Sequence, residues 1–203
     1  MRNHIQFQTP VLDYGSNDGH VASRIFKNCA DTEIYIADIQ NNINSTFKNR
    51  PWTFLSITKE TSRIESPQNF FGSATCIHVL EHVPNPENVI QEIYRVLQAG
   101  GTFYLETPNP RSLYMPSMSR KSTWNFYDDP THIRPYSASA LARLCEANGF
   151  VIKKAGIYRR WRYALALPLA PLISLVMRDW RPFHYAMIHA MGWSSYCLCE
   201  KPT

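Results

Sequence analysis

The stretch Val11-Leu12-Asp13-Tyr14-Gly15-Ser16-Asn17-Asp18-Gly19 decides the fold of this chain. Its first four residues are a short apolar run that predicts a strand, and the glycines that follow predict a turn. After Gly19, apolar residues recur at helical spacing through Phe26 and predict a helix. Glycine lets the backbone approach a ligand closely because it has no side chain. The turn is therefore either the ligand loop of a strand-turn-helix unit or a plain structural turn.

Strands and helices alternate along the rest of the chain. Apolar and β-branched runs predict further strands at residues 33–38, 53–57, 73–78, 102–106, 150–157 and 195–201. Helical patterns lie between them: a weak one over residues 41–48, a clear one that Asn85 can cap, and one that Ser137 can cap. This alternation predicts an α/β fold with a Rossmann-like, seven-stranded, mostly parallel sheet and helices on both faces.

Ligands of such sheets bind beyond the carboxyl ends of the strands, near the point where the strand order reverses. Asp38 ends the second strand, where a carboxylate can accept hydrogen bonds from both ribose hydroxyls, although a helix cap is its plainer interpretation. The turn from Gly15 to Gly19 lacks the third glycine of the Gly-x-Gly-x-x-Gly pattern, which disfavours a dinucleotide. The segments expected to meet at this edge are residues 13–19, Asp38, the end of the third strand, residues 77–82 and residues 106–108.

Composition narrows the class of protein. The chain has 203 residues, of which 44% are hydrophobic and 18% charged, enough for one domain with a sizeable core. Five cysteines without a Cys-x-x-Cys pair, and an N-terminus without an apolar run, predict reduced core thiols in a cytoplasmic protein. The net charge of +5 comes from residues 153–181, which carry seven basic side chains and one acid. A basic segment beside an apolar one favours a membrane surface or an anionic substrate over nucleic acid.

Four segments of the chain form a recognisable series: residues 11–19, Val79-Leu80-Glu81-His82-Val83-Pro84-Asn85-Pro86, Leu97-Gln98-Ala99-Gly100-Gly101-Thr102-Phe103 and Asp129-Pro130-Thr131-His132-Ile133-Arg134-Pro135-Tyr136-Ser137. In order and spacing they resemble class I S-adenosylmethionine-dependent methyltransferases. The last segment is similar to a block in members that act on sugars and other small molecules of the cell surface and of secondary metabolism. The resemblance covers residues 9–157 and the final strand, and it implies an antiparallel last strand and S-adenosylmethionine as the cofactor.

The resemblance also implies roles for individual residues. Where the family usually has an acid after the third strand, this chain offers Ser56 or Thr58. Only ten residues precede the first strand, so we expect the helix that usually covers the cofactor to be short or missing, and another segment to close the site. By position, the methionine pocket would be shaped by Asp13, Gly15, Ser16 and Gly19. Asp38 would hold the ribose, and Ile39 would flank the adenine with Ser56 nearby. The floor near the sulfonium would be lined by Ile77 and His78.

An acceptor that is a hydroxyl or a carbon acid must lose a proton, and histidine suits that task near neutral pH. His132 lies in a polar and aromatic loop before a helix and is the catalytic candidate; a substrate contact or a structural role are its alternatives. His82 is more typical of a residue that ties a loop, and Glu81 and Glu106 are weaker catalytic candidates. Asp128-Asp129 with His132 could bind a metal, but a solvated loop explains the cluster as well, so we expect no metal.

The segment between the sixth and seventh strands is longer than a hairpin needs. Residues 163–177 are uncharged, and as one helix they would reach about 22 Å, too short for a hydrocarbon core of about 30 Å. Pro168 and Pro171 favour two short helical pieces. The segment is either a helical hairpin packed on the sheet or on a second subunit, or an interfacial element whose flanking arginines and tryptophans meet anionic lipid.

These observations predict three parts: an S-adenosylmethionine-binding core at residues 1–157, an apolar, Arg-flanked helical insertion at 158–193 and a final strand at 194–203. The predicted protein is a methyltransferase of a small molecule: a sugar, a glycolipid or another cell-envelope or secondary metabolite. The alternative is a non-catalytic protein with the same fold, acting as a partner or binding a membrane surface. Thr107-Pro108-Asn109-Pro110 lies one strand too late to match the motif of DNA and RNA amino-methyltransferases, so we expect no nucleic-acid partner. We expect a cytoplasmic protein that can associate peripherally with the inner membrane face through residues 158–193, with its oligomeric state open.

Overall fold

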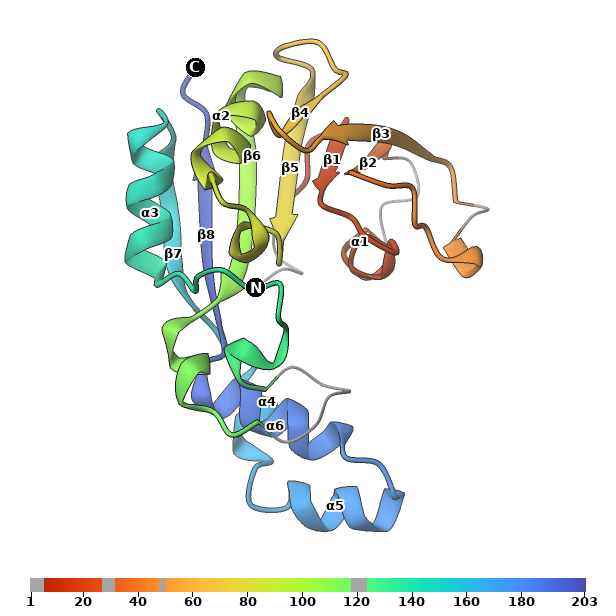
Figure 1. Ribbon diagram of the computed structural model, residues 1–203, viewed down its shortest axis with the longest axis vertical. Helices are drawn as coiled ribbons and strands as arrows, with labels where there is room; N and C mark the ends of the chain where they lie inside the picture. The colour runs from red at the N-terminus through yellow and green to blue at the C-terminus, as the bar shows by residue number, and fades with distance from the viewer. Residues whose placement is uncertain (1–5, 27–31, 48–49, 118–123) are drawn as a thin grey trace.

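The computed structural model describes residues 6–26, 32–47, 50–117 and 124–203. Its centre is an eight-stranded sheet with the strand order β4-β3-β2-β1-β5-β6-β8-β7 (Figure 1). Neighbouring strands from β3 to β6 are parallel, whereas β8 is antiparallel to both β6 and β7. The strands are β1 (Val11–Tyr14), β2 (Ile34–Asp38), β3 (Trp52–Thr58), β4 (Arg63–Ile64), β5 (Phe71–Ile77), β6 (Leu97–Pro108), β7 (Val151–Tyr158) and β8 (Ser194–Glu200).

This topology confirms the predicted Rossmann-like sheet and locates its switch point. From β1 the chain runs outward through β2 to β3, and it then returns to the other side of β1 through β5 to β6. Val11 accordingly pairs with Ile34 on one side and with Ser73 on the other. The carboxyl ends of β1 and β5 are therefore the place where a crevice for a ligand opens.

Helices cover both faces of the sheet because its strands are apolar on both sides. Helix α2 (Pro86–Val96) buries an apolar stripe of Val89, Ile90, Ile93 and Val96 in the main core, which α3 (Ala138–Ala147) also joins. On the opposite face, α1 (His20–Ile25) buries Ala22 in a smaller cluster with Val11 and Ile34. The Ser137 side chain caps α3 by accepting from the Ala140 amide, as predicted.

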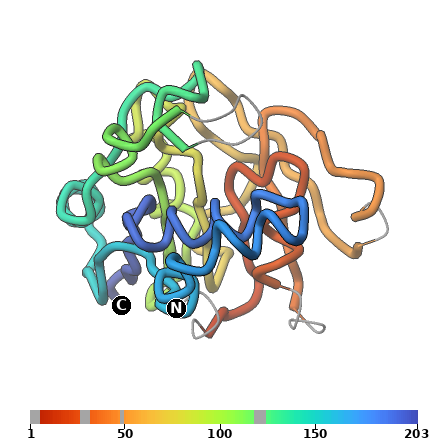
Figure 2. The backbone as a smooth tube through the Cα atoms, turned by 90° about the horizontal axis from the view of Figure 1, so that it is seen from below, coloured from red at the N-terminus to blue at the C-terminus, as the bar shows by residue number. Residues whose placement is uncertain are grey.

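Three helices fill the segment between β7 and β8. They are α4 (Trp161–Leu165), α5 (Ala170–Met177) and α6 (Arg181–Met191), and α6 packs against the other two. The run 163–177 is thus broken into short helices, as its prolines predict. Figure 1 shows these helices beyond the carboxyl ends of the parallel strands, with α5 farthest from the sheet, and Figure 2 shows them crossing that end of the molecule.

Local structure departs from the sequence predictions in four respects. The weak helix expected over residues 41–48 is wrong, because the described part of that segment holds only a 3-10 turn at Ser45–Phe47. The two-residue strand β4 was not expected, and β6 begins five residues earlier than predicted. Asn85 makes no side-chain cap at α2, where Pro86 begins the helix. Four of the five cysteines are buried free thiols, as predicted, and Cys29 lies outside the described residues.

Candidate active site

The turn after β1 has the geometry of a ligand loop. Gly15 and Gly19 have φ values of 79° and 81°, in the left-handed region that side chains other than glycine rarely adopt. A Cβ atom at Gly15 would lie 2.2 Å from Cγ2 of Val79, so this position has no room for a side chain. The Gly15 amide donates to the Ala37 carbonyl at 2.8 Å, which joins the turn to the end of β2. The glycines that the sequence singled out are therefore required by the backbone.

Asp38 is held at the edge of this turn by two backbone amides. Its Oδ2 accepts from the Asn17 amide at 2.6 Å, and its Oδ1 accepts from the Ile39 amide at 2.7 Å. Each carboxylate oxygen keeps a further lone pair for a ligand. Ile39 beside it leaves 48% of its surface exposed, an apolar side chain in the place where an adenine face could rest.

A cavity of about 290 Å³ opens at the switch point between β1 and β5. Gly15, Asp38, Ile39 and His78, four of the predicted cofactor residues, line it. Apolar walls and a few fixed polar groups are typical of a cofactor pocket. The remaining lining residues, which the sequence analysis did not assign to the cofactor, are Tyr14, Asn17, Ile57, Lys59, Ser62, Val79, His82, Val83 and Pro84.

The other predicted cofactor residues lie behind or beside the cavity. Asp13, Ser16 and Ile77 are buried, and Asp13 accepts a hydrogen bond of 2.6 Å from the Thr75 hydroxyl. Gly19 precedes α1, while Ser56 is exposed on β3 next to Ile57, which does line the cavity. Adjacent residues of a strand point to opposite faces of the sheet. Ile57 therefore lines the cavity, whereas its neighbour Ser56 does not.

His78 stands at the centre of a polar network whose two carboxylates, those of Glu81 and Glu106, are buried. Its Nδ1 lies 3.2 Å from Oε1 of Glu81, and its Nε2 lies 4.0 Å from Oε1 of Glu106. Glu81 also accepts from the Thr107 hydroxyl at 2.9 Å. Burial alone would raise the pKa of the Glu81 carboxyl, but the hydrogen bond and the charge of His78 outweigh it and hold that pKa below its ordinary value. Glu81 is therefore a carboxylate at neutral pH, able to stabilise a proton on His78.

His132 lies one side chain away from the cavity. Its Nδ1 donates to the Phe126 carbonyl at 2.6 Å, and its ring stacks on Phe126 with centroids 4.6 Å apart. The ring also contacts His82, with centroids 4.8 Å apart, and His82 does line the cavity. His132 itself is not among the described residues that line this cavity. The Thr131 hydroxyl lies 2.9 Å from Nδ1 of His82, which fits the predicted role of His82 in tying a loop.

Two clusters within the described residues could supply metal ligands. Glu81, His82 and His132 offer ligand atoms within 4.8 Å of one another, and of these three His82 lines the cavity. Cys145, Cys197 and Cys199 do so inside the core. Burial raises the pKa of the Cys199 thiol well above its ordinary value, so at neutral pH this thiol stays protonated and packs as an apolar group.

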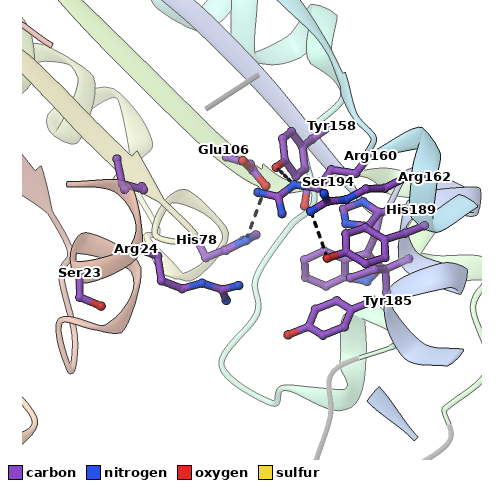
Figure 3. A pocket seen from close by; sticks show the side chains of 14 residues that line it. Ser23, Arg24, His78, Glu106, Tyr158, Arg160, Arg162, Tyr185, His189 and Ser194 are labelled. Atoms are coloured by element: carbon purple, nitrogen blue, oxygen red, sulfur yellow. Dashed lines mark hydrogen bonds and ion pairs between the residues drawn. The ribbon is translucent and has the colours of Figure 1, made fainter. Parts of the chain in front are cut away.

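A second cavity meets the first at His78, which lines both. It has a volume of about 540 Å³ and lies between α1, the ends of β5 and β6, and the helices α4 and α6. Figure 3 shows His78 between the α1 side of this cavity, marked by Ser23 and Arg24, and the aromatic and basic side chains of the insertion. Two cavities joined at one titratable side chain can hold two reactants side by side.

Comparison with known proteins agrees with this geometry. Ubiquinone biosynthesis O-methyltransferase of Pseudomonas entomophila is 31% identical over 98 residues, 45% of this chain and 42% of that protein. The chain thus matches under half the length of such curated relatives. A SAM-dependent methyltransferase of Archaeoglobus fulgidus has the same fold, with a TM-score of 0.63 and 21% identity over 94% of this chain and 85% of that one.

A second solved structure was determined with the cofactor. Phosphoethanolamine N-methyltransferase 2 of Haemonchus contortus, in complex with S-adenosyl-L-methionine, has a TM-score of 0.68 and 13% identity over all of this chain and 51% of that one. At such identities the two structural likenesses show the fold alone. The family profile described as a methyltransferase domain matches residues 8–155, most of the sequence. The chain therefore belongs to the class I S-adenosylmethionine-dependent methyltransferase family.

Proposed function

We propose that this chain transfers a methyl group from S-adenosylmethionine to a small-molecule acceptor. The observation that carries the proposal is the pair of cavities joined at His78, one of which has the glycine turn and the fixed Asp38 carboxylate. The residues present fit the cofactor. Gly15 lines the cavity with backbone and no side chain, Asp38 can accept from ribose hydroxyls, and Ile39 with Ile57 offers apolar faces to the adenine.

His78 is the residue that we place at the reacting atoms. When bound, the cofactor supplies a methyl group from its sulfonium, whose sulfur keeps the electron pair of the broken carbon–sulfur bond as the acceptor oxygen forms the new bond. The acceptor's hydroxyl proton goes to Nε2 of His78, because the Glu81 carboxylate holds the ring proton at Nδ1. Glu81 and Glu106 then stabilise the imidazolium. In this arrangement His132, the catalytic candidate of the sequence analysis, positions His82.

The acceptor that we propose is a hydroxylated metabolite: a sugar, a glycolipid or another cell-envelope or secondary metabolite. The segment from Asp129 to Ser137 supports this class by its resemblance to members that act on sugars. The O-methyltransferase relative is named for a reaction at oxygen, which supports a hydroxyl as the methylated group.

Turnover tests the proposal against a non-catalytic protein with the same fold. The full chain is incubated with S-adenosylmethionine carrying a labelled methyl group and with a panel of free sugars, sugar phosphates, glycolipids and phenols. We expect release of S-adenosylhomocysteine that depends on one class of acceptor, with the label recovered on it. Binding of S-adenosylmethionine without transfer to any acceptor of the panel would favour the non-catalytic alternative.

We also propose that the insertion contacts an anionic membrane surface. Leu165, Leu175 and Val176 are each at least 69% exposed, so α4 and α5 present an apolar surface to solvent. Arg178 follows α5, Trp180 precedes α6, and both are exposed as well. Aromatic rings and cations that border an apolar patch suit a headgroup layer that carries negative charge. No helix in the described ranges is long and apolar enough to cross a bilayer.

A further inference from the structure

The second cavity has a strongly cationic lining. Arg24 of α1, Arg160 just before α4 and Arg162 within α4 contribute guanidinium groups to it (Figure 3). They come from two sides, α1 and the insertion, and in Figure 3 they are directed into the space beside His78. None of the three forms an ion pair with a carboxylate of the described residues. The cavity therefore concentrates positive charge beside the proposed reacting atoms.

Contacts with tyrosines orient two of these arginines, Arg160 and Arg162. Nε of Arg160 donates to the Tyr158 hydroxyl at 2.7 Å, and Tyr158 is a buried residue at the end of β7. Arg162 lies over the Tyr163 ring, 4.9 Å from its centroid, and donates to the Tyr163 hydroxyl at 3.4 Å. Such contacts orient a guanidinium and leave most of its five N–H groups for a ligand.

Glu106, the one acidic residue among the described residues of the lining, does not cancel this charge at the mouth of the cavity. Glu106 is only 2% exposed, and its Oε2 accepts from the Tyr104 hydroxyl at 2.7 Å. Its other carboxylate oxygen faces His78. Glu106 therefore belongs to the proton network, and the open side of the cavity remains available to an anion.

We propose that this cavity binds the acceptor through a phosphate group held between Arg160, Arg162 and Arg24, with a hydroxyl of the same molecule facing His78. The inference rests on the proposed methyltransferase function and names the chemical class of its acceptor. Guanidinium groups bind phosphate through paired, charge-assisted hydrogen bonds. A volume of about 540 Å³ suits a phosphorylated molecule of sugar size, and Tyr158, Tyr185 and Trp193 supply aromatic faces for an apolar sugar surface.

The phosphate could belong to a soluble metabolite or to a lipid. Tyr163 and Tyr185 line this cavity and also a further one of about 370 Å³ between the helices of the insertion, where Ala166, Ala170 and Ile173 provide apolar walls. A hydrocarbon attached to the phosphate would have a path toward the exposed surface of α5. A soluble metabolite and a lipid would present the same phosphate group to the arginines. The experiment therefore tests inorganic phosphate first and then distinguishes the two sources.

Calorimetric titration of inorganic phosphate into the full chain tests the site without requiring turnover. We expect one saturable site, and we expect Arg160→Gln and Arg162→Gln to weaken it by about tenfold or more each. Arg143→Gln, which removes an exposed charge on α3, is the matched control and should change the affinity by less than about twofold. Equal losses in all three variants, or no phosphate binding by the parent protein, would overturn the proposal.

Titration of S-adenosylhomocysteine into the same variants keeps the two proposals distinguishable. Unchanged cofactor affinity shows that the arginine variants are folded, and loss of phosphate binding alone then supports the acceptor site. Phosphate binding without any cofactor binding would overturn the methyltransferase proposal while leaving the anion site in place.

Two further arms identify the source of the phosphate. Displacement of inorganic phosphate by a hexose phosphate indicates a soluble acceptor. Binding to phosphatidylcholine vesicles that contain phosphatidic acid, when Arg160→Gln weakens it and Arg143→Gln does not, indicates a lipid-borne phosphate. Failure of both probes to compete for the site would contradict a phosphate-bearing acceptor.

Discussion

His78 and His132 differ in what their rings contact, and this difference leads to a kinetic prediction. His78 lines both cavities and adopts φ 57°, a backbone conformation that asparagine tolerates better than most residues. We expect His78→Asn to lower turnover by about 10² to 10⁴-fold, the usual contribution of a positioned proton acceptor. His132→Asn should lower turnover less, because His132 acts through His82, and it should also lower the melting temperature by loosening the stack on Phe126.

Steady-state turnover and thermal unfolding of the matched pair His78→Asn and His132→Asn check this prediction. Cofactor affinity, measured on the same samples, separates a lost proton acceptor from a distorted pocket. If His78→Asn keeps turnover within a few-fold of the parent and His132→Asn loses most of its turnover, His132 and not His78 is the catalytic residue.

The sequence located the strand ends of the site but could not choose among the histidines that follow them. The backbone of His78 adopts a left-handed conformation, which sets the direction of its side chain. Residue preferences do not predict this conformation, because positive φ is uncommon outside glycine. Ser56 and Ile57 illustrate the same limit in a strand, because a shift of one residue exchanges the face of the sheet. Gly15 and Asp38 were predictable because turn geometry and strand ends restrict residue type strongly.

At the scale of elements, the strands and helices with clear periodicity were predicted well. The apolar stripe runs along the whole of α2, and the residues of β5 are buried from end to end. Patterns of this length identify a helix or a strand without ambiguity. The two-residue strand β4 is too short to have a pattern of its own. In residues 41–47 the Asn44 side chain accepts from the Thr46 amide, and this local bond favours a turn over the helix that the sequence suggested.

The exposed side chains of α5 predict membrane binding that depends on salt. Val176 is 76% exposed and Leu175 is 69% exposed. Burying such side chains in the headgroup boundary stabilises the bound state by about 1.5 to 3 kcal/mol each at most. We expect the full chain to float with anionic vesicles at low salt and to be released at high salt, because screening weakens its arginine contacts.

A pair of substitutions to serine makes the flotation assay specific. Leu175→Ser with Val176→Ser should reduce the bound fraction by about tenfold or more. Val151→Ser, which changes an exposed valine on β7, should leave it unchanged. Two results together would contradict the membrane proposal. The parent protein would fail to float with anionic vesicles at low salt, and a variant with residues 163–177 made polar would keep full activity on a soluble acceptor.

At the scale of the whole molecule, three cavities follow one another from the switch point of the sheet to the insertion, and each shares lining residues with the next. The cofactor cavity and the cationic cavity share His78, and the cationic cavity shares Tyr163 and Tyr185 with the apolar one. The insertion thereby lies across the carboxyl ends of the strands, where the sequence analysis expected another segment to close the site (Figures 1 and 2). The fold and the insertion together build the proposed acceptor site.

The central claim is that S-adenosylmethionine binds at the carboxyl ends of β1 and β2. Calorimetric titration of the cofactor into the parent chain, Asp38→Ala and Glu33→Ala tests it directly. Glu33 is the matched control because its carboxylate lies just before the start of β2, at the opposite end from Asp38, where it accepts from the Tyr35 hydroxyl at 2.6 Å. Asp38→Ala should weaken binding by about 1 to 3 kcal/mol, the usual loss when a charged acceptor of hydrogen bonds is removed, and Glu33→Ala should not change it. An affinity of Asp38→Ala equal to that of the parent chain would contradict the account and place the cofactor elsewhere.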